Sequence, residues 1–313
     1  MNRSHTQLLL RCGCMAEGFI QNNTSSKLPE DLGMEYHGEL VSRNLLEPRD
    51  AFHGQSVCTM HDLVRDFAQL VAKDEGLFVS EGESSSTSLA NRKLRHLSIS
   101  RDATELGSLE TEASLRTLML FNRPVTYGYL DNLRCLRVLH ISCNDVNLME
   151  FPEYVCQLKH LRYLLLRGTS ISKIPEGIGD LKFLQAIDLV GSINLCQLPE
   201  SILKLQNLRC ISLYGTKITS IPRGFGKLKN LVNLQGITTH SDYSGDGWCS
   251  LEELGSLLKL KYLYITCLDK APSGSVAARA KLSSKQHLIW LQLIFTSDFT
   301  VNWEVQDPPP SIG

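Results

Sequence analysis

The sequence lacks any apolar run long enough to cross a membrane. Its uninterrupted apolar stretches, such as residues 163–166, are only a few residues long, far below the roughly 20 residues that a membrane-spanning helix needs. We also expect no secretory leader, because the apolar stretch Leu8–Leu10 is too short for one and Arg11 interrupts it. We therefore expect no membrane span and a cytoplasmic location.

A charge excess of either sign is missing as well. Lys and Arg together number 32, and Asp and Glu number 33, in a chain of 313 residues. A balanced surface offers no large single-sign field to nucleic acid or to an anionic membrane, so we predict neither as a partner. The hydrophobic fraction of 42% is typical of folded proteins.

The motifs of enzymes and metal sites are also absent. The ten cysteines include no CxxC pair, and no His/Cys cluster has zinc-ligand spacing. The sequence holds no G-x-S-x-G elbow, no defensible pair of catalytic carboxylates and no P-loop of the form G-x-x-x-x-G-K-[S/T]. We therefore predict that the chain is not an enzyme and binds no metal and no cofactor by itself.

One pattern, in contrast, recurs nine times. It is Leu-x-x-Leu-x-Leu, with isoleucine as an occasional substitute, and the unit at Leu231 is degraded. The first leucines of the nine units are Leu94, Leu115, Leu136, Leu161, Leu184, Leu208, Leu231, Leu260 and Leu288. They lie 21, 21, 25, 23, 24, 23, 29 and 28 residues apart, close to the roughly 20 to 29 residues of a leucine-rich repeat. The pattern predicts an α/β solenoid with one short parallel strand per repeat.

Prolines support the same register. Four of them fall nine residues before a first leucine, and each follows an apolar residue, in the pairs Phe151–Pro152, Ile174–Pro175, Leu198–Pro199 and Ile221–Pro222. We predict that the apolar residue plugs the core while the proline prevents continued strand pairing. The ninth position of the unit holds Asn144, Thr169 or Thr216, short polar side chains that we expect to satisfy buried backbone groups.

Recognition falls to the side chains that point outward from the strands, because the leucines form the core. Exposed tyrosine and arginine side chains dominate the energetics of interfaces. The candidates for partner contact are His140, Tyr163, Arg167, Asp188, Tyr214 and Tyr264. A basic column also follows the first leucines, at Arg95, Arg116, Arg137, Arg162, Arg209 and Lys261. We interpret this column as a solvated edge or a stack with acidic groups, and not as a nucleic-acid track.

Residues 28–80 have helical spacing in place of the repeat. Apolar positions within 32–41 predict one helix, and those within 63–71 predict a second. Thr59, three residues before Asp62, resembles a capping box at the start of the second helix.

Between the two helices, residues 45–46 and 57–58 look like short strands that flank a polar loop containing Pro48 and Gly54. The order helix, two strands, helix predicts a small winged-helix-like unit. Residues 82–88, rich in Glu and Ser, predict a linker. We therefore divide the chain into residues 1–82 and a repeat domain of residues 83–313.

Residues 60–66, Met-His-Asp-Leu-Val-Arg-Asp, resemble the MHD motif of plant nucleotide-binding leucine-rich-repeat (NB-ARC) disease-resistance proteins. Residues 15–20 and 30–46 are similar to the stretches that lead up to this motif in the family. Leu-Arg-x-Leu strands with Ile-Pro or Leu-Pro returns are also the family's usual repeat style. The resemblance thus covers nearly the whole chain, whose first 82 residues look like the end of the family's nucleotide-binding region.

The resemblance implies roles for two residues. In the family the motif's histidine senses the diphosphate of bound ADP and its aspartate holds the local geometry, so these roles fall on His61 and Asp62. A histidine at a helix N-terminus is consistent with phosphate binding. The alternative is that His61 is only a residue of the first helical turn and that Asp62 is only a helix cap. Because the P-loop is missing, we expect these residues to sense ADP or ATP only if another domain supplies it.

The leading hypothesis from this resemblance is the C-terminal part of a plant innate immune receptor. Its repeats would recognise a pathogen effector or a guarded host protein and would regulate a nucleotide switch. One alternative is a regulatory lobe whose ADP/ATP switch is completed by the nucleotide-binding domain of another chain. A second alternative is a free-standing leucine-rich-repeat scaffold.

Overall fold

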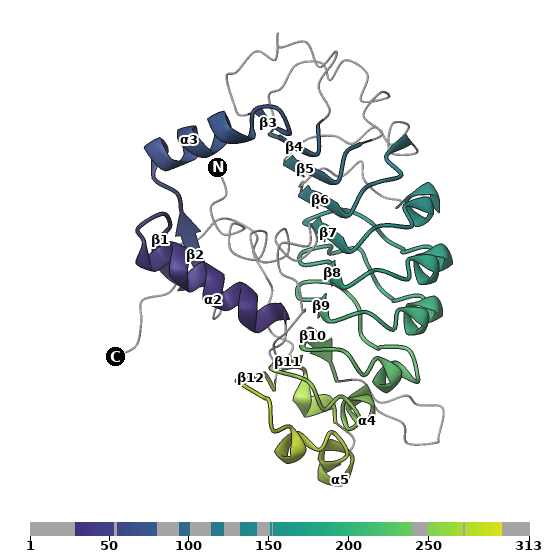
Figure 1. Ribbon diagram of the computed structural model, residues 1–313. Helices are drawn as coiled ribbons and strands as arrows, with labels where there is room; N and C mark the ends of the chain where they lie inside the picture. The colour runs from purple at the N-terminus through teal and green to yellow at the C-terminus, as the bar shows by residue number, and fades with distance from the viewer. Residues whose placement is uncertain are drawn as a thin grey trace.

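The computed structural model describes residues 29–52, 55–79, 94–100, 114–121, 132–142, 151, 153–239, 250–271 and 273–295. The larger of its two sheets has ten strands that follow one another in chain order, β3 to β12. Every neighbouring pair in it is parallel. The sheet curves into an arc with its strands on the inner side and short helical turns on the outer side (Figure 1). The predicted α/β leucine-rich-repeat solenoid is confirmed.

The nine predicted repeat strands are all present. They are β4 (His96–Ile99), β5 (Thr117–Phe121), β6 (Val138–Ser142), β7 (Tyr163–Arg167), β8 (Ala186–Asp188), β9 (Cys210–Ser212), β10 (Asn233–Thr238), β11 (Tyr262–Thr266) and β12 (Trp290–Leu293). A tenth strand, β3 (Gly76–Val79), pairs with β4 and precedes the repeats. The sequence does not reveal β3, because Leu77 and Val79 are too few to show the repeat.

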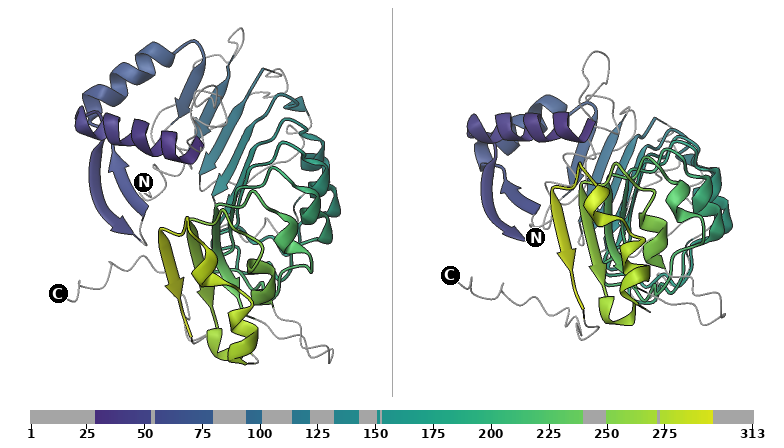
Figure 2. Two further views of the ribbon diagram at one scale, coloured as in Figure 1. Left: turned by 60° about the horizontal axis from the view of Figure 1, so that its bottom comes forward. Right: turned by 90° about the horizontal axis from the view of Figure 1, so that it is seen from below.

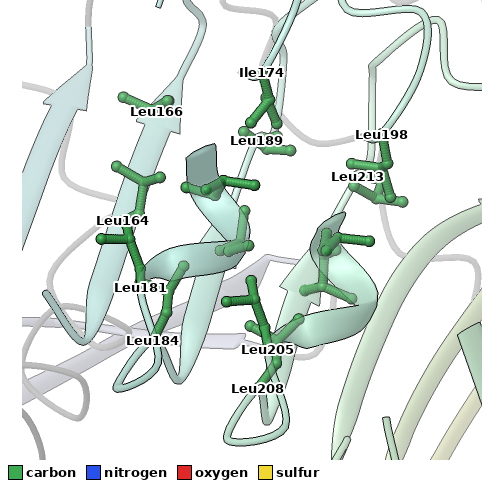
Figure 3. Packing of buried hydrophobic residues seen from close by; sticks show 14 of the residues in the cluster. Leu164, Leu166, Ile174, Leu181, Leu184, Leu189, Leu198, Leu205, Leu208 and Leu213 are labelled. Atoms are coloured by element: carbon green, nitrogen blue, oxygen red, sulfur yellow. The ribbon is translucent and has the colours of Figure 1, made fainter. Parts of the chain in front are cut away.

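The core lies between the sheet and the outer turns. The repeat leucines point into it and are almost completely shielded from solvent; Leu164 and Leu208, for example, are both 0% exposed. Figure 3 shows Leu164 of β7 close to Leu181, which follows the outer turn η5 (Glu176–Asp180), and to Leu184, the first leucine of the next repeat. Each coil therefore buries its apolar side chains only when the next coil covers them, so the solenoid is stabilised by neighbouring repeats.

The degraded repeat contains a bulge. In β10 the pairing with β11 shifts between Gln235 and Ile237, so Gly236 is one extra residue in the strand. Ile237 takes the place of the third leucine and is 1% exposed. Gly236 has φ +80°, and a Cβ there would lie 2.5 Å from the backbone nitrogen of Tyr214. Only glycine fits this position.

The outer turns are short 3₁₀ helices in most repeats: η4 (Glu153–Gln157), η5 (Glu176–Asp180), η6 (Glu200–Lys204) and η7 (Phe225–Lys227). Pro175 and Pro199 are the N-caps of η5 and η6, with extended backbones that end strand pairing. The four apolar residues before the prolines are buried, as predicted, at Phe151, Ile174, Leu198 and Ile221. Pro152 lies outside the described residues.

The polar position at the bend behaves as predicted where it is described. The Thr216 hydroxyl donates to the carbonyl oxygen of Leu213 at 2.8 Å. Thr169 is hydrogen-bonded to the Ser192 hydroxyl at 2.9 Å, and Ser192 in turn donates to the carbonyl oxygen of Leu166. These bonds satisfy backbone groups that the bend buries. Asn144 lies outside the described residues.

The last repeats carry different outer segments. These are α4 (Ser250–Leu254), η8 (Leu268–Lys270), α5 (Gly274–Ala278) and η9 (Leu282–Ser284). Glu253 of α4 accepts hydrogen bonds from the backbone N–H groups of Gly224 and Gly226, at 2.7 and 2.8 Å, and so joins α4 to η7. Lys285, which is 5% exposed, donates to the carbonyl oxygens of Leu254 and Leu257.

The segment before the repeats has the predicted order of helix, two strands and helix. It consists of α2 (Pro29–Ser42), the antiparallel pair β1 (Glu47–Phe52) and β2 (Gln55–Thr59), and α3 (Asp62–Ala72). Asn44, with φ 56°, ends α2 in the left-handed conformation. Figure 1 shows this segment across the open side of the arc, and Figure 2 shows the same arrangement from two other directions.

Three details of this segment differ from the sequence expectation. Residues 45 and 46 form the bend before β1 and not a strand. Pro48 lies within β1, opposite Cys58, and not in the loop; a two-stranded sheet has only edge strands, which tolerate proline. The N-cap of α3 is His61 and not Thr59, because Thr59 still belongs to β2. Gly54 and the predicted linker at residues 82–88 lie outside the described residues.

Candidate protein-binding face and the His61 segment

The outward-pointing side chains of the strands form rows across the concave side of the arc. The strand register places His140 opposite Leu165, Leu165 opposite Asp188, and Tyr264 opposite Gln292. Because every strand is parallel and in register, equivalent positions of successive repeats become neighbours. The predicted contact residues of β6, β7, β8 and β11 therefore share one face.

Arg167 and Asp188 form an ion pair on this face. The Nε and one terminal nitrogen of Arg167 donate to Oδ2 of Asp188 at 2.8 and 2.5 Å. Oδ1 of Asp188 accepts a hydrogen bond from the backbone N–H of Val190 at 3.1 Å. The Asp188 side chain is 5% exposed and that of Arg167 is 14% exposed, so the pair is held in place and largely desolvated.

Tyr214, Tyr264 and Trp290 form an aromatic cluster toward the C-terminal end of the face. The ring centroids of Tyr214 and Tyr264 are 5.5 Å apart, and those of Tyr264 and Trp290 are 6.3 Å apart. Burial raises the pKa of Tyr264 to about 12, with a smaller contribution from neighbouring Tyr214. Burial also raises the pKa of Tyr214. Both phenols therefore stay neutral near pH 7 and offer aromatic surface with a polar tip.

A second apolar cluster lies on the same face between β6 and β9. It consists of Val138, Tyr163, Leu165 and Ala186, with Cys210 packed against it. The Tyr163 hydroxyl donates to Oε1 of Gln185 at 3.3 Å. Aliphatic and aromatic side chains thus replace the polar residues that a solvated sheet face usually carries.

The expectation that the predicted contact residues are exposed was wrong for four of the six. His140 is 0%, Tyr163 2%, Asp188 3% and Tyr264 6% exposed. His140 lies edge-on to Phe121, with ring centroids 4.9 Å apart. Packing between adjacent strands produces contacts of this kind, which the outward position of one residue in its own strand cannot reveal. Arg167 and Tyr214 are partly exposed.

His61 and Asp62 lie at the start of α3, next to one another but with separate partners. Nδ1 of His61 accepts a hydrogen bond from the backbone N–H of Leu63 at 3.3 Å, which makes His61 the N-cap. Asp62 forms an ion pair with Arg65 at 2.8 Å on the helix surface. Both side chains are exposed. The first turn of α3 therefore has its Leu63 N–H bonded to His61 and carries the Asp62 carboxylate on its surface.

The helix that follows His61 carries an exposed apolar face. Leu63 is 74%, Phe67 67%, Leu70 62% and Val71 69% exposed. Their spacing places them on one side of α3. An apolar face of this size is typical of a protein contact.

No group of three or more His, Cys, Asp or Glu side chains could hold a metal ion within the described part of the chain. Among the described helices, none is long and apolar enough to cross a membrane.

One contact between distant residues could not be predicted from the sequence. Nζ of Lys261, just before β11, lies 2.5 Å from Oδ1 of Asp31 in α2, although 230 residues separate the two in sequence. In the sequence, Lys261 is a member of the basic column and Asp31 lies in the family-like stretch 30–46. No local pattern could have paired them.

Comparison with known proteins gives two family matches. A profile described as "Leucine-rich repeat region" matches residues 114–311, which is more than half of the chain. A second profile, described as "Disease resistance protein Winged helix domain", matches residues 13–68. The two profiles cover the repeats and the segment that precedes them.

Two relatives in Arabidopsis thaliana, RPP13-like proteins 3 and 1, are named for disease resistance. They are 30% and 34% identical to this chain over 191 and 188 residues. The alignments cover 57% and 55% of this chain but 22% and 17% of the relatives. The chain therefore spans about a fifth of the length of these curated relatives.

Among solved structures, the plant peptide hormone receptor RGFR1, solved in complex with RGF2, has a TM-score of 0.50 with this chain. It is 20% identical, and the alignment covers 79% of this chain and 36% of that one. At this level of identity the similarity concerns the fold alone.

Proposed function

Because the chain belongs to the leucine-rich-repeat family and carries the winged-helix and repeat regions of plant disease-resistance proteins, we propose that it is the sensing part of an immune receptor. In this proposal the concave face binds a pathogen effector or a guarded host protein in the cytoplasm. The chemistry of that face is the observation that carries the proposal.

The face combines apolar area with fixed polar groups. Tyr214 and Trp290 are partly exposed, and both contact Tyr264. Large aromatic side chains that are already ordered contribute area to an interface at little cost in conformational entropy. The Arg167–Asp188 pair lies on the same face, on β7 and β8, and β8 pairs directly with β9, the strand that precedes Tyr214. Such a surface favours a folded protein partner over a highly charged polymer.

Regulation of a nucleotide switch is the second part of the proposal. His61 and Asp62 could supply one imidazole donor and an ordered helix start to the phosphates of ADP or ATP. They cannot form a complete nucleotide site, because the sequence has no P-loop lysine or glycine cradle. We therefore propose that these residues act only when a nucleotide-binding domain of the same receptor type is present, in the same protein or in another chain.

The exposed face of α3 supports a contact with that domain. Its four apolar residues follow directly after His61 on the same helix. If a nucleotide-binding domain packs on this face, we expect the phosphates of its bound nucleotide to lie near the end of the helix that carries His61. We propose that residues 1–82 belong functionally with the nucleotide-binding domain and residues 83–313 with the partner.

A panel of secreted pathogen proteins, titrated against the immobilised full chain by biolayer interferometry, tests the recognition proposal. For a protein that binds, Tyr214→Ala and Trp290→Ala are expected to raise Kd about tenfold or more, since central aromatic residues contribute over about 1 kcal/mol. Lys204→Ala, on the outer turn η6, is the matched control and should leave Kd unchanged. The proposal would be contradicted if neither concave substitution changed Kd, or if no protein of the panel bound the chain.

A further inference from the structure

The strand β12 forms one end of the sheet (Figure 1), and within the described residues no strand lies beyond it. On its inner side it bonds to β11; the N–H of Ile294, just after β12, donates to the carbonyl oxygen of Ile265 at 2.9 Å. Because the backbone groups of successive strand residues point to opposite edges, those of Leu291 and Leu293 point away from β11. The open edge of β12 can therefore pair with a further strand.

The side chains at this end of the solenoid are apolar and exposed. Four alternate residues form what we call the end row: Ile289, Leu291, Leu293 and Phe295, which are 67%, 40%, 37% and 63% exposed. The equivalent residues of β11, Leu263 and Ile265, are 0% and 1% exposed, because β12 and its coil cover them. A repeat protein needs a capping segment over its last coil to remain soluble, so the end row needs a cover.

The sequence that follows β12 has the pattern of a strand. Apolar and polar residues alternate strictly over positions 299–305, Phe-Thr-Val-Asn-Trp-Glu-Val, which is typical of a half-buried strand. The intervening residues 296–298, Thr-Ser-Asp, are of types that favour turns. Residues 296–313 lie outside the described residues, but the leucine-rich-repeat profile continues to residue 311. The alternating segment therefore belongs to the repeat region.

We propose that residues 299–305 form an eleventh strand that pairs antiparallel with β12 and covers the end row. A three-residue turn at 296–298, a common hairpin length, fixes the register of this strand. The register gives the pairs Leu293–Val301, Leu291–Trp303 and Ile289–Val305. Each exposed apolar residue thus meets another apolar residue, whereas a shift by one position would set it against Thr, Asn or Glu.

A second copy of the chain is the competing occupant of this edge. Two β12 strands could pair around a twofold axis at Gln292, because the end row is symmetric about that residue. The chain's own segment has the advantage, since a three-residue connection gives it an effective concentration on the order of millimolar. A second copy must instead pay the entropy of association.

The strand has a consequence for recognition, which rests on the proposed function. Within strands β3 to β12 the only Asp, Glu, Lys or Arg residues are Arg167 and Asp188, which pair with each other. The proposed register sets Glu304 opposite Trp290 and so adds a carboxylate beside the aromatic cluster. A partner that docks there then presents a basic side chain. Glu304→Gln should raise the Kd of such a partner roughly fivefold; an unchanged Kd would contradict this placement.

Hydrogen–deuterium exchange of the full chain, resolved to single amides by mass spectrometry, tests the strand. The amides of Leu291 and Leu293 should exchange at least about tenfold more slowly than in an unstructured peptide, because the eleventh strand accepts their hydrogen bonds. The amide of Ile187, in the middle of the sheet, reports whether the solenoid itself is folded.

Two proline variants make the test specific to the register. Val301→Pro removes an N–H that the register directs at Leu293, and it should speed exchange of Leu291 and Leu293 about tenfold. Asn302→Pro is the matched control, because its N–H points away from β12, and it should leave both amides protected. Exchange of Ile187 should stay slow in both variants.

Three results would overturn the strand. The first is free exchange of Leu291 and Leu293 in the wild-type chain, and the second is equal acceleration by the two proline variants. The third is protection that survives Val301→Pro and is lost on dilution, which would assign the edge to a second copy.

The test is independent of recognition. Protected Leu291 and Leu293 amides in a chain that binds no member of the pathogen panel would support the strand and contradict the proposed function. Partner binding by a chain in which both amides exchange freely would do the reverse.

Discussion

Arg167 and Asp188 lie on adjacent strands, β7 and β8, where two guanidinium nitrogens of Arg167 donate to a single carboxylate oxygen of Asp188. The sequence places these residues 21 positions apart, and only the parallel register of two repeats brings them together. A largely desolvated pair of this kind holds the surface of the concave face in one geometry.

Removal of one partner should destabilise the fold. Arg167→Leu leaves Asp188 charged and 5% exposed without its cation, which should lower the free energy of unfolding by about 3 kcal/mol. The double variant Arg167→Leu with Asp188→Leu should recover part of this loss. Urea denaturation measures both.

The exposed pair Arg43–Glu39, with side chains 67% and 54% exposed, is the control. Glu39→Ala should change the free energy of unfolding by less than about 1 kcal/mol. An Arg167→Leu effect no larger than that of Glu39→Ala would mean that the concave pair is solvated.

Replacing Gly236 and Gly38 by alanine should change the free energy of unfolding in opposite directions. At Gly236 the positive φ and the 2.5 Å approach of the Tyr214 backbone leave no room for a Cβ, so Gly236→Ala should cost about 1 to 3 kcal/mol. Gly38, within α2, has no atom within 4 Å of an added Cβ. Gly38→Ala should therefore stabilise the helix by about 0.5 to 1 kcal/mol. The unfolding temperatures of the two variants measure these effects. Equal shifts in unfolding temperature would argue against the bulge at Gly236.

The tyrosine cluster should have a signature at high pH. Because the pKa of Tyr264 is raised from its ordinary value of 10 to about 12, the folded chain retains this proton after the unfolded chain has lost it. The resulting stabilisation is complete below pH 10 and disappears as the pH rises to about 12.

Absorbance at 295 nm reports tyrosine ionisation, with circular dichroism recorded alongside to follow folding. Tyr264→Phe should remove a late component of the titration, because the pKa of Tyr264 is raised by its burial. If Tyr264→Phe leaves the late component in place, the aromatic cluster does not bury Tyr264.

The apolar face of α3 should matter for association more than for folding. Phe67→Glu changes a residue that is 67% exposed, so the free energy of unfolding should change by less than about 0.5 kcal/mol. Its binding to a nucleotide-binding domain from the disease-resistance family should weaken at least tenfold in a titration. Gln69→Glu adds the same charge on another side of the helix and should leave binding intact; equal losses would point to charge alone.

The features that could be predicted from the sequence depend on near neighbours in the chain. The nine repeat strands follow from leucine spacing, and the caps of η5 and η6 follow from Pro175 and Pro199, because each repeat folds against the next. The Gly236 bulge is also visible in the sequence, because the third apolar position of the repeat at Leu231 comes one residue late, at Ile237.

The features that could not be predicted depend on distant contacts. His140 points outward from its strand but is covered, and its partner Phe121 belongs to another repeat. The Asp31–Lys261 contact depends on how the solenoid curves, which no local pattern encodes. Pro48 in β1 shows the same limit, because its tolerance depends on the sheet having only two strands.

Hydroxyl-radical footprinting shows whether a partner protein docks on the concave face. Tyr214 and Trp290 report on that face, and Phe183, which is 54% exposed between η5 and β8, reports on the surface away from it. A bound pathogen protein from the panel should reduce labelling of Tyr214 and Trp290 and leave Phe183 unchanged. Protection of Phe183 with undiminished labelling of Tyr214 and Trp290 would contradict docking on the concave face.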